Sequence, residues 1–324
     1  MKLDRSTSLS QAEDFLKSCI RYGLAHSLES HKSIRWVKPY PEVTGYLVSY
    51  FCRYQMSHES VVGQAIDKLL SIQHPSGGYS SFYDKDKLYS FDTGQIITGL
   101  TDAYRATGRK DCLISARHAG DFLLSMQIDS GLMFPIYDTK RDTKIVYQKS
   151  SDGSNWGSTF SYIQVKNAEG LISLYELTKE RKYYNTASRL VNLKMNKADY
   201  HYTHPLAYYL EGLVALGQID RVKKIIQKHV LPRLKPNGYI AYYPKATFAY
   251  VSGSVQMGIL LWKVGYKNQA KQILGWAARV QGNSSAGGLY QYATSSGKPD
   301  ASIHTEINSW GTKYYCELLR LVVN

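Results

Sequence analysis

The sequence lacks several features that would point to particular kinds of protein. It has only 4 cysteines in 324 residues, and they stand far apart. Three of them fall in apolar helical stretches where a small hydrophobe packs well, so we expect reduced core cysteines and no disulfide framework. No stretch reaches the roughly 18 uninterrupted apolar residues of a membrane span, and the N-terminal MKLDRSTSLSQAEDFLKS has no apolar leader core. These absences predict a soluble, cytoplasmic protein.

The sequence also lacks the short motifs of most cofactor-dependent enzymes. It contains no GxGxxG, P-loop, HExxH, CxxC or GxSxG motif, so nucleotide, zinc and serine-hydrolase chemistry have no motif support. The segment from Gln73 to Tyr79 is reminiscent of terpene cyclase and prenyltransferase repeats, but the acidic clusters of those enzymes, DxDD and DDxxD, are absent. We expect no cofactor and no bound metal.

Acidic residues are scarce relative to basic ones. The chain has 26 Asp and Glu against 40 Lys and Arg, which gives a formal net charge of +14 and a pI of about 9.4. This surplus favours a polyanionic partner: a nucleic acid, an acidic membrane surface or an acidic polysaccharide. The basic residues are spread out, with only short clusters such as Arg221 to Lys224, and there is no zinc finger, RNP motif or dense basic run. We therefore expect an acidic oligo- or polysaccharide rather than a nucleic acid.

What the sequence has in excess is tyrosine, with 28 residues, inside a composition that is 44% hydrophobic and 13% aromatic. Such a composition is ample for a large core and argues against disorder. Tyrosine joins a flat apolar ring to a polar tip, which suits an aromatic-lined binding groove as well as ordinary packing.

One short pattern recurs six times along the whole chain. Each copy has a polar or Gly-containing opening, a small residue and then apolar residues at helical spacing. Its equivalent positions are 49, 71, 42, 46 and 53 residues apart: Tyr50, Gly99, Gly170, Gly212, Gly258 and Gly311. Between the copies lie partner helices that end in a glycine, which is the least costly residue for a left-handed helix cap.

This repeat predicts an all-α fold, a single (α/α)6 toroid of about six helical hairpins over residues 1–324. The six copies form the inner ring, the partner helices form the outer ring, and 137–159 form an inserted loop. Each outer helix leads through a Gly-aromatic loop, in short β-hairpins or extended segments, into the next inner helix. Those loops and helix starts should therefore share one mouth, where helix N-termini favour an anion by roughly 0.3–1 kcal/mol each.

Polar residues near the starts of the inner helices are the candidates for chemistry. His204 precedes a proline at a helix start. Asp92 could instead be a helix N-cap, and Glu42 a first-turn acid that complements the helix dipole. The catalytic candidates are His204, Glu42, Tyr46, Asp92, Glu211, His304 and Glu306. The candidates for substrate binding are Tyr79, Tyr83, Gln95, Tyr137, Lys166, Tyr209, Tyr243, Tyr290, Asn308 and Trp310.

Two types of reaction could use these candidate residues. Proton abstraction next to a uronate carboxylate needs a base, an acid and groups that neutralise the carboxylate; Lys166, Gln95 and Asn308 could serve the last purpose. Glycoside hydrolysis needs two carboxyl groups about 5 to 9.5 Å apart, and Glu42 and Asp92 are among the candidates. A protein that only binds glycans or helps to assemble them would need the aromatic mouth alone.

The repeat segments also carry a resemblance to known proteins. They are PYPEVTGY (39–46), FDTGQIITGL (91–100), THPLAYYLEGL (203–213), SGSVQMGILL (252–261) and NSWGTKYYCELL (308–319). With these motifs the chain resembles toroidal proteins encoded with bacterial surface-polysaccharide genes, and more distantly uronosyl C5-epimerases, polysaccharide lyases and unsaturated-glucuronyl hydrolases. The resemblance implies an acidic-sugar substrate. We expect an epimerase or lyase that acts by proton abstraction on an anionic, uronate-containing cell-surface polysaccharide or its precursor; a glycoside hydrolase and a non-catalytic glycan-binding or assembly protein are the alternatives.

Overall fold

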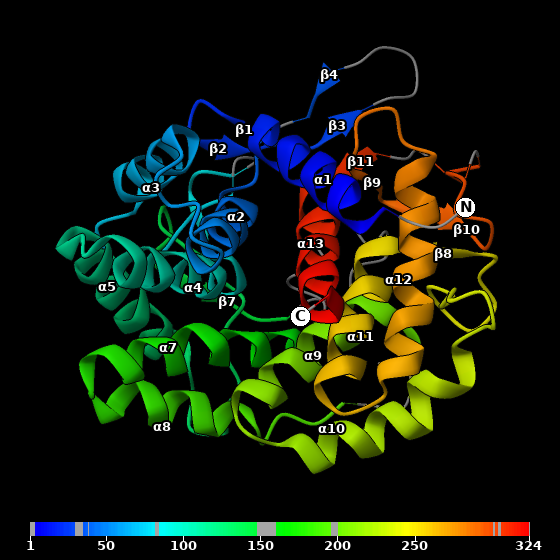
Figure 1. The fold of residues 1–324 in the computed structure, drawn as a ribbon. Coiled ribbons are helices and arrows are strands. Elements are labelled where there is room, and N and C mark those ends of the chain that lie inside the picture. The colour runs from blue at the N-terminus through cyan, green and yellow to red at the C-terminus, as the bar shows by residue number, and fades with distance from the viewer. Residues whose placement is uncertain are drawn as a thin grey trace.

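The helices form a closed ring of hairpins, as the computed structural model shows (Figure 1). The structure describes residues 4–29, 35–37, 39–81, 84–147, 160–195, 200–300, 302–303 and 306–323. An inner set of helices surrounds the centre, and an outer set covers it. This arrangement confirms the predicted (α/α)6 toroid.

The inner ring consists of six helical segments that run in the same direction. Each inner segment packs against the next around the ring, and the last, α13, packs against the first, α2. These helices are buried on nearly all sides, which explains why their sequences are apolar all round rather than on one stripe. They are α2 (Pro41–Arg53), α4 (Ser90–Thr107), η1 with α7 (Ser161–Asn167 and Ala168–Thr178), α9 (Thr203–Ala215), α11 (Val251–Lys263) and α13 (Ser309–Val323).

The outer ring brings the two ends of the chain together. The first outer helix, α1, packs against the last inner helix, α13. Nε of Arg320 on α13 lies 3.1 Å from a carboxylate oxygen of Glu13 on α1, and Tyr50 on α2 donates to the same carboxylate. The outer helices are α1 (Arg5–Cys19), α3 (Ser60–Ile72), α5 (Lys110–Met126), α8 (Arg181–Leu190), α10 with η3 and η4 (Ile219–Ile225, Ile226–Val230 and Leu231–Arg233) and α12 (Lys267–Gly282).

Glycines at the repeat positions let the inner helices approach each other closely. A Cβ atom on Gly99 of α4 would lie 2.5 Å from the carbonyl oxygen of Gly45 on α2, and one on Gly212 of α9 would lie 2.1 Å from the carbonyl oxygen of Val165 on η1. These separations are too short for any side chain, so the ring requires glycine there. The small residues in the repeat therefore have a packing role that offsets their low helix propensity.

Short strands connect the hairpins in four small antiparallel sheets. The inserted segment contributes β6 and β7 to one of them, whereas residues 148–159 of that predicted loop lie outside the described residues. The sheets are β1–β2, β10–β8, β4–β3–β11–β9 and β5–β6–β7, with strands β1 (Ile20–Arg21), β2 (Leu24–Ala25), β3 (Leu28–Glu29), β4 (Arg35–Trp36), β5 (Lys87–Tyr89), β6 (Ile136–Asp138), β7 (Thr143–Ile145), β8 (Phe248–Tyr250), β9 (Leu289–Tyr290), β10 (Tyr292–Thr294) and β11 (Glu306–Asn308).

The cysteines and the helix lengths match two further expectations. Cys19, Cys52, Cys112 and Cys316 are all buried and unbridged, as predicted for core residues. Over the described parts of the chain, no helix combines the length and the apolar character needed to cross a membrane.

Candidate functional site

A cavity of about 280 Å³ lies where the inner helices begin. Tyr40 and Glu42 come from the start of α2, His204 from the start of α9 and Trp310 from the start of α13. The prediction that the starts of the inner helices share one aromatic mouth is therefore confirmed for the elements that line the cavity. The lining residues are Tyr40, Glu42, Val43, Phe160, His204, Pro205, Tyr208, Tyr242, Tyr250, Gln291, Tyr292 and Trp310.

An aromatic residue directly precedes five of the six inner segments. These residues are Tyr40, Tyr89, Phe160, Tyr202 and Tyr250. Three of them line the cavity, so one repeated position supplies much of its aromatic wall. The sequence-based candidates did not include these residues, although an aromatic residue before five of the six copies of the repeat is a signal that could have identified them.

His204 is held between two tyrosine rings. Its imidazole centroid lies 4.4 Å from the ring of Tyr208 and 4.6 Å from that of Tyr250. The side chain is almost fully buried, and burial lowers the pKa of His204 to about 3. The ring is therefore neutral at physiological pH, which is the form a general base must have.

A hydrogen-bond chain determines which nitrogen of His204 carries the proton. Nδ1 of His204 lies 2.7 Å from Oε1 of Gln256, whose Nε2 donates to Glu211 at 3.0 Å. The same Glu211 oxygen also lies 2.9 Å from Nζ of Lys166. Because an ion-paired carboxylate only accepts, it orients the Gln256 amide with its oxygen towards His204. Nδ1 then donates, and Nε2 keeps the lone pair.

Lys166 is a buried cation between two carboxylates. Its Nζ lies 2.6 Å from Glu169 as well as 2.9 Å from Glu211. Burial opposes the charge on Lys166, but the two carboxylates outweigh it and raise the pKa of the lysine above its ordinary value. Lys166 therefore fixes the carboxylate of Glu211 beneath the cavity rather than lining the cavity itself.

Glu42 and Asp92 form a pair of interacting acids at the starts of α2 and α4. Burial raises the pKa of Glu42 well above its ordinary value, and the nearby charge of Asp92 raises it further. Burial also raises the pKa of Asp92, to about 7. The buried Tyr46 hydroxyl interacts with Glu42 and partly opposes this shift. The raised pKa favours the protonated form of Glu42, which is the form that can act as a general acid.

The cavity is otherwise uncharged among the residues described. Its described lining contains no lysine or arginine. Gln291 supplies an amide, which donates to the hydroxyl of Tyr250 at 3.3 Å. Aromatic walls with a few polar groups are typical of sites that hold a small polar ring, and the volume is near the lower end of the roughly 300–1,000 Å³ of such sites.

Several predicted residues lie in the framework around the cavity. Tyr79 is fully buried and contacts Ser115, and Gln95 bonds to Asn167 between α4 and η1. Asn308 accepts from the backbone N–H of Gly311 at 2.7 Å at the start of α13. The bonds of Tyr79 and Gln95 join separate segments, and that of Asn308 caps α13, so the polarity of these residues in the sequence reflects the framework.

The remaining candidates lie at the rim or away from the cavity. Tyr243 packs against Tyr242 at the rim, and Glu306 accepts there from the backbone N–H of Gln291. Tyr209, Tyr290 and Tyr137 bond through their hydroxyls to Leu193, Asn283 and Asp142, respectively. His304 and Tyr83 lie outside the described residues.

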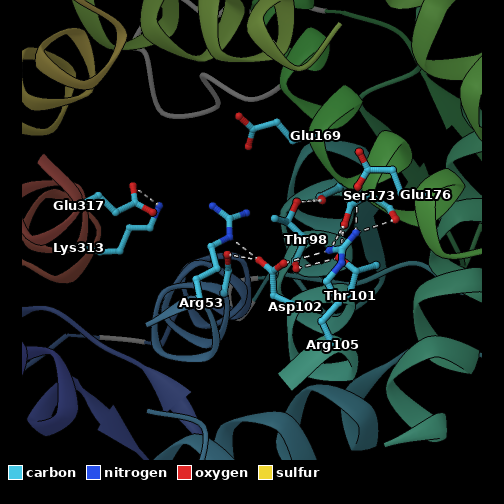
Figure 2. A network of polar contacts seen from close by, with 12 residues as sticks. Arg53, Thr98, Thr101, Asp102, Arg105, Glu169, Ser173, Glu176, Lys313 and Glu317 are labelled. Atoms are coloured by element: carbon cyan, nitrogen blue, oxygen red, sulfur yellow. Dashed lines mark hydrogen bonds and ion pairs between the residues drawn. The ribbon is translucent and has the colours of Figure 1, made fainter. Parts of the chain in front are cut away.

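A second polar cluster lines the centre of the ring towards the C-terminal ends of α2 and α4 (Figure 2). Asp102 of α4 accepts from Nε of Arg53 at 2.7 Å, Nη1 of Arg105 at 3.1 Å and Ser49 at 2.7 Å. Arg105 continues to Glu176 of α7 at 3.1 Å. These charges are paired with one another and connect three inner helices, which assigns them a structural role. Across the described residues, no group of three His, Cys, Asp or Glu side chains is arranged to hold a metal.

Comparison with known proteins identifies the fold through solved structures of low sequence identity. No protein-family model matches the sequence, and a comparison with curated proteins finds no match. Solved structures match over nearly the whole chain. An unsaturated glucuronyl hydrolase specific for heparin has a TM-score of 0.70 at 14% identity, with 98% of this chain and 96% of that chain covered. Cellobiose 2-epimerase from Bacillus thermoamylovorans B4167 has a TM-score of 0.71 at 13% identity, covering 98% and 100%.

D-mannose isomerase is a third such structure, with a TM-score of 0.69 at 14% identity and coverage of 100% of this chain and 98% of that chain. The expected likeness to epimerases and unsaturated-glucuronyl hydrolases is thus confirmed at the level of the fold. Identities this low establish the ring architecture, and the chemistry must be argued from the residues of the cavity.

Proposed function

We propose that this protein is a carbohydrate-active enzyme that moves a proton on a sugar carbon next to a carbonyl or carboxyl group, as an epimerase or a lyase does. The observation that carries the proposal is that one aromatic cavity is lined by both His204, held in a single tautomer by Gln256, and Glu42, an acid whose pKa is raised by burial. The solved structures that share the fold include sugar epimerases and an isomerase, which supports a sugar as the substrate.

The proton transfers follow from the charge states of the two residues. Nε2 of His204 accepts the carbon-bound proton, and the electron pair of the broken C–H bond moves into the neighbouring carbonyl group. Glu42 donates its proton to the oxygen on which negative charge develops, which stabilises the intermediate. The site then holds an imidazolium and a carboxylate, whose opposite charges favour each other. For epimerisation, the hydroxyl of a tyrosine that lines the cavity donates a proton to the opposite face of the carbon, and Glu42 takes back the proton from the oxygen as the carbonyl group re-forms. The tyrosinate and the imidazolium then return to their starting states by proton exchange with solvent.

Two features of the cavity suit this chemistry. Stacking on Tyr250 and the tilted ring contact with Tyr208 restrain the imidazole, so the base is held in place before substrate binds. The remaining aromatic rings offer flat apolar surfaces to the faces of a sugar ring. The proposed substrate is a uronate-containing polysaccharide or its precursor, which presents a carboxyl group next to the acidic C5–H bond.

Glycoside hydrolysis is a second candidate, favoured by one observation. Glu42 and Asp92 are neighbouring carboxyl groups whose pKa values are both raised, and the pKa of Asp92 is about 7. A protonated acid beside a carboxylate is the arrangement that glycosidases use. Asp92 is not among the residues that line the cavity, whereas His204 is, which favours proton abstraction.

Incubation of the protein with uronate polymers and reducing sugars in deuterated water distinguishes proton abstraction, glycoside hydrolysis and glycan binding without catalysis. Deuterium on a sugar carbon supports proton abstraction, and the ultraviolet absorbance of a new double bond identifies a lyase. New reducing ends without deuterium or unsaturation indicate hydrolysis and would overturn the proposal. Binding of a polymer without any chemical change would indicate a glycan-binding protein and would overturn both enzymatic hypotheses, proton abstraction and hydrolysis.

A further inference from the structure

Charge is distributed unevenly along the chain. Residues 221–299 contain 12 Lys and Arg and no Asp or Glu, whereas the rest of the chain contains 28 basic and 26 acidic residues. Almost all of the net charge of +14 therefore comes from a quarter of the sequence. This segment begins within α10 and continues through η3, η4, α11 and α12 to the loop after β10, and all of it is described.

Most of these basic side chains are exposed and form no close ion pair, although the charge of Lys263, at the end of the inner helix α11, lowers the pKa of Glu169. We call the ten exposed ones the cationic sector: Lys223, Lys224, Lys228, Lys235, Lys245, Lys263, Lys267, Lys271, Arg279 and Lys298. None of them forms an ion pair with a carboxylate in the described part of the chain. Elsewhere on the ring, several exposed cations are paired, as Lys140 is with Asp86 at 2.6 Å and Lys182 with Asp121 at 2.6 Å, and acidic residues balance the basic ones in number.

Hydrogen bonds join the elements of the cationic sector into one surface. The amide of Gln227 on η3 donates to the hydroxyl of Tyr266 at 2.8 Å, which links η3 to the start of α12. Arg279, near the end of α12, donates to the carbonyl of Asn237 at 2.7 Å, and Asn237 donates to that of Ser295 at 2.9 Å. In Figure 1, α10 (yellow-green) lies along the bottom of the ring and α12 (orange) at its right.

The cationic sector reaches the rim of the cavity at two points. Lys245 follows Tyr243 by two residues, and the Tyr243 ring lies 5.9 Å from that of Tyr242, which lines the cavity. The carbonyl of Lys298 accepts from the backbone N–H of Thr294 at the end of β10, and β10 begins with a cavity residue. A linear ligand with one end in the cavity can therefore continue onto the cationic sector.

We propose that the cationic sector binds an acidic polysaccharide whose chain extends from the cavity along the outer face of α12. The part of this proposal that places a chain end in the cavity rests on the proposed function, and the binding to the sector does not. Nine of the ten cations are lysines. A lysine ammonium group acts as a point charge and suits the separate carboxylates of an acidic polysaccharide, whereas phosphate groups are often bound by the two parallel N–H donors of an arginine. The sector thus supplies the positive charge that is missing from the described lining of the cavity.

Binding of the full-length protein to polygalacturonate tests this proposal, with neutral dextran as the uncharged polymer and a short DNA duplex as the other polyanion. The test variant carries Lys224→Glu, Lys267→Glu and Lys271→Glu. The matched control carries Lys85→Glu, Lys110→Glu and Lys194→Glu, which are exposed lysines outside the sector with the same total charge change. We expect the test variant to bind polygalacturonate at least about tenfold more weakly, with a shallower salt dependence, and the control to lose less than about threefold.

Two results would overturn the proposal. Equal weakening by both variants would mean that net charge alone attracts the polymer. Equal or tighter binding of the DNA duplex at physiological salt, lost in the same variant, would make a nucleic acid the partner. Deuterium exchange on a small reducing sugar is measured in parallel and is expected to be unchanged in the test variant. A failure of the proposed function is thereby distinguished from a failure at the cationic sector.

Discussion

The imidazole of His204 and the carboxamide of Gln256 form a 2.7 Å hydrogen bond between two adjacent inner helices, α9 and α11. The amide in turn donates to Glu211, which Lys166 holds as an ion pair. Because each partner dictates the orientation of the next, the proton of the neutral imidazole stays on Nδ1. Gln256 is therefore a positioning residue for the proposed base.

Replacement of Gln256 tests this positioning. Gln256→Leu removes the acceptor for Nδ1–H, so kcat should fall about 10- to 100-fold while KM changes little, by analogy with the loss of residues that orient metal-bound histidines. The matched control is Gln95→Leu, another buried glutamine on an inner helix, which bonds to Asn167 instead. The control should lower stability without a selective loss of kcat. Equal kcat values for Gln256→Leu and wild type would contradict the assigned role.

The approach of α11 to His204 gives a second prediction. A Cβ atom on Gly253 would lie 2.8 Å from both N and Cα of His204, so Gly253→Ala must push the backbone of the proposed base away from its position. Activity should fall at least about tenfold, since small displacements of a catalytic group are costly. Gly275→Ala on α12 meets no atom within 4 Å, and it should be neutral or stabilising by up to about 1 kcal/mol. Thermal melting and initial rates of both variants measure the difference.

The raised pKa of Asp92 predicts how stability depends on pH. Its folded-state pKa of about 7 lies above the ordinary value of 3.8, so the folded protein binds more protons than the unfolded chain between these values. The contribution of Asp92 to stability is therefore fully present below about pH 4 and is lost as pH rises to about 7. Asp92→Asn should raise the melting temperature by a few degrees at pH 8 and have little effect at pH 4. A stabilisation that is the same at both pH values would contradict the raised pKa.

Replacement of Lys166 tests how much its buried ion pairs contribute to the free energy of unfolding, compared with an exposed ion pair. Lys166→Met leaves the buried Glu211 and the partly buried Glu169 without their cation, which should cost about 3–5 kcal/mol of unfolding free energy. Lys182→Met breaks an exposed pair with Asp121 and should cost less than about 1 kcal/mol. Denaturant titration of both variants measures these costs. Similar losses for the two would show that Lys166 has no special structural role.

The fold could be predicted because its determinants are local and repeated. Five of the six inner segments carry glycine at the repeat position, followed by apolar residues. Gly99 and Gly212 are required because an added Cβ atom would lie only 2.5 Å and 2.1 Å from a neighbouring backbone oxygen. Glu42, His204 and Trp310 were identified for the same reason, since each lies at the start of an inner helix. The mouth could also be predicted, because the inner helices all run in the same direction and therefore begin at the same end of the ring.

The rest of the site depends on contacts between segments that are distant in sequence. Gln256 is 52 residues from His204 and 45 from Glu211, and no spacing rule connects them. Lys166 and Asn308 have the polarity expected of ligand-binding residues, yet Lys166 pairs with Glu211 on the neighbouring α9 and Asn308 caps the start of its own helix, α13. A rotation of about 100° per residue decides whether a helical side chain faces the cavity or the next helix, and this rotation is set by packing around the whole ring.

The central claim is that His204 removes a carbon-bound proton from a sugar in the cavity at the mouth of the ring. Proton NMR of a uronate oligosaccharide in deuterated water, with wild-type protein and His204→Ala at equal concentration, tests it most directly. The account predicts loss of the C5 proton signal with the wild type and at least about a hundredfold slower loss with the variant. Wild-type exchange that persists undiminished in His204→Ala would contradict it.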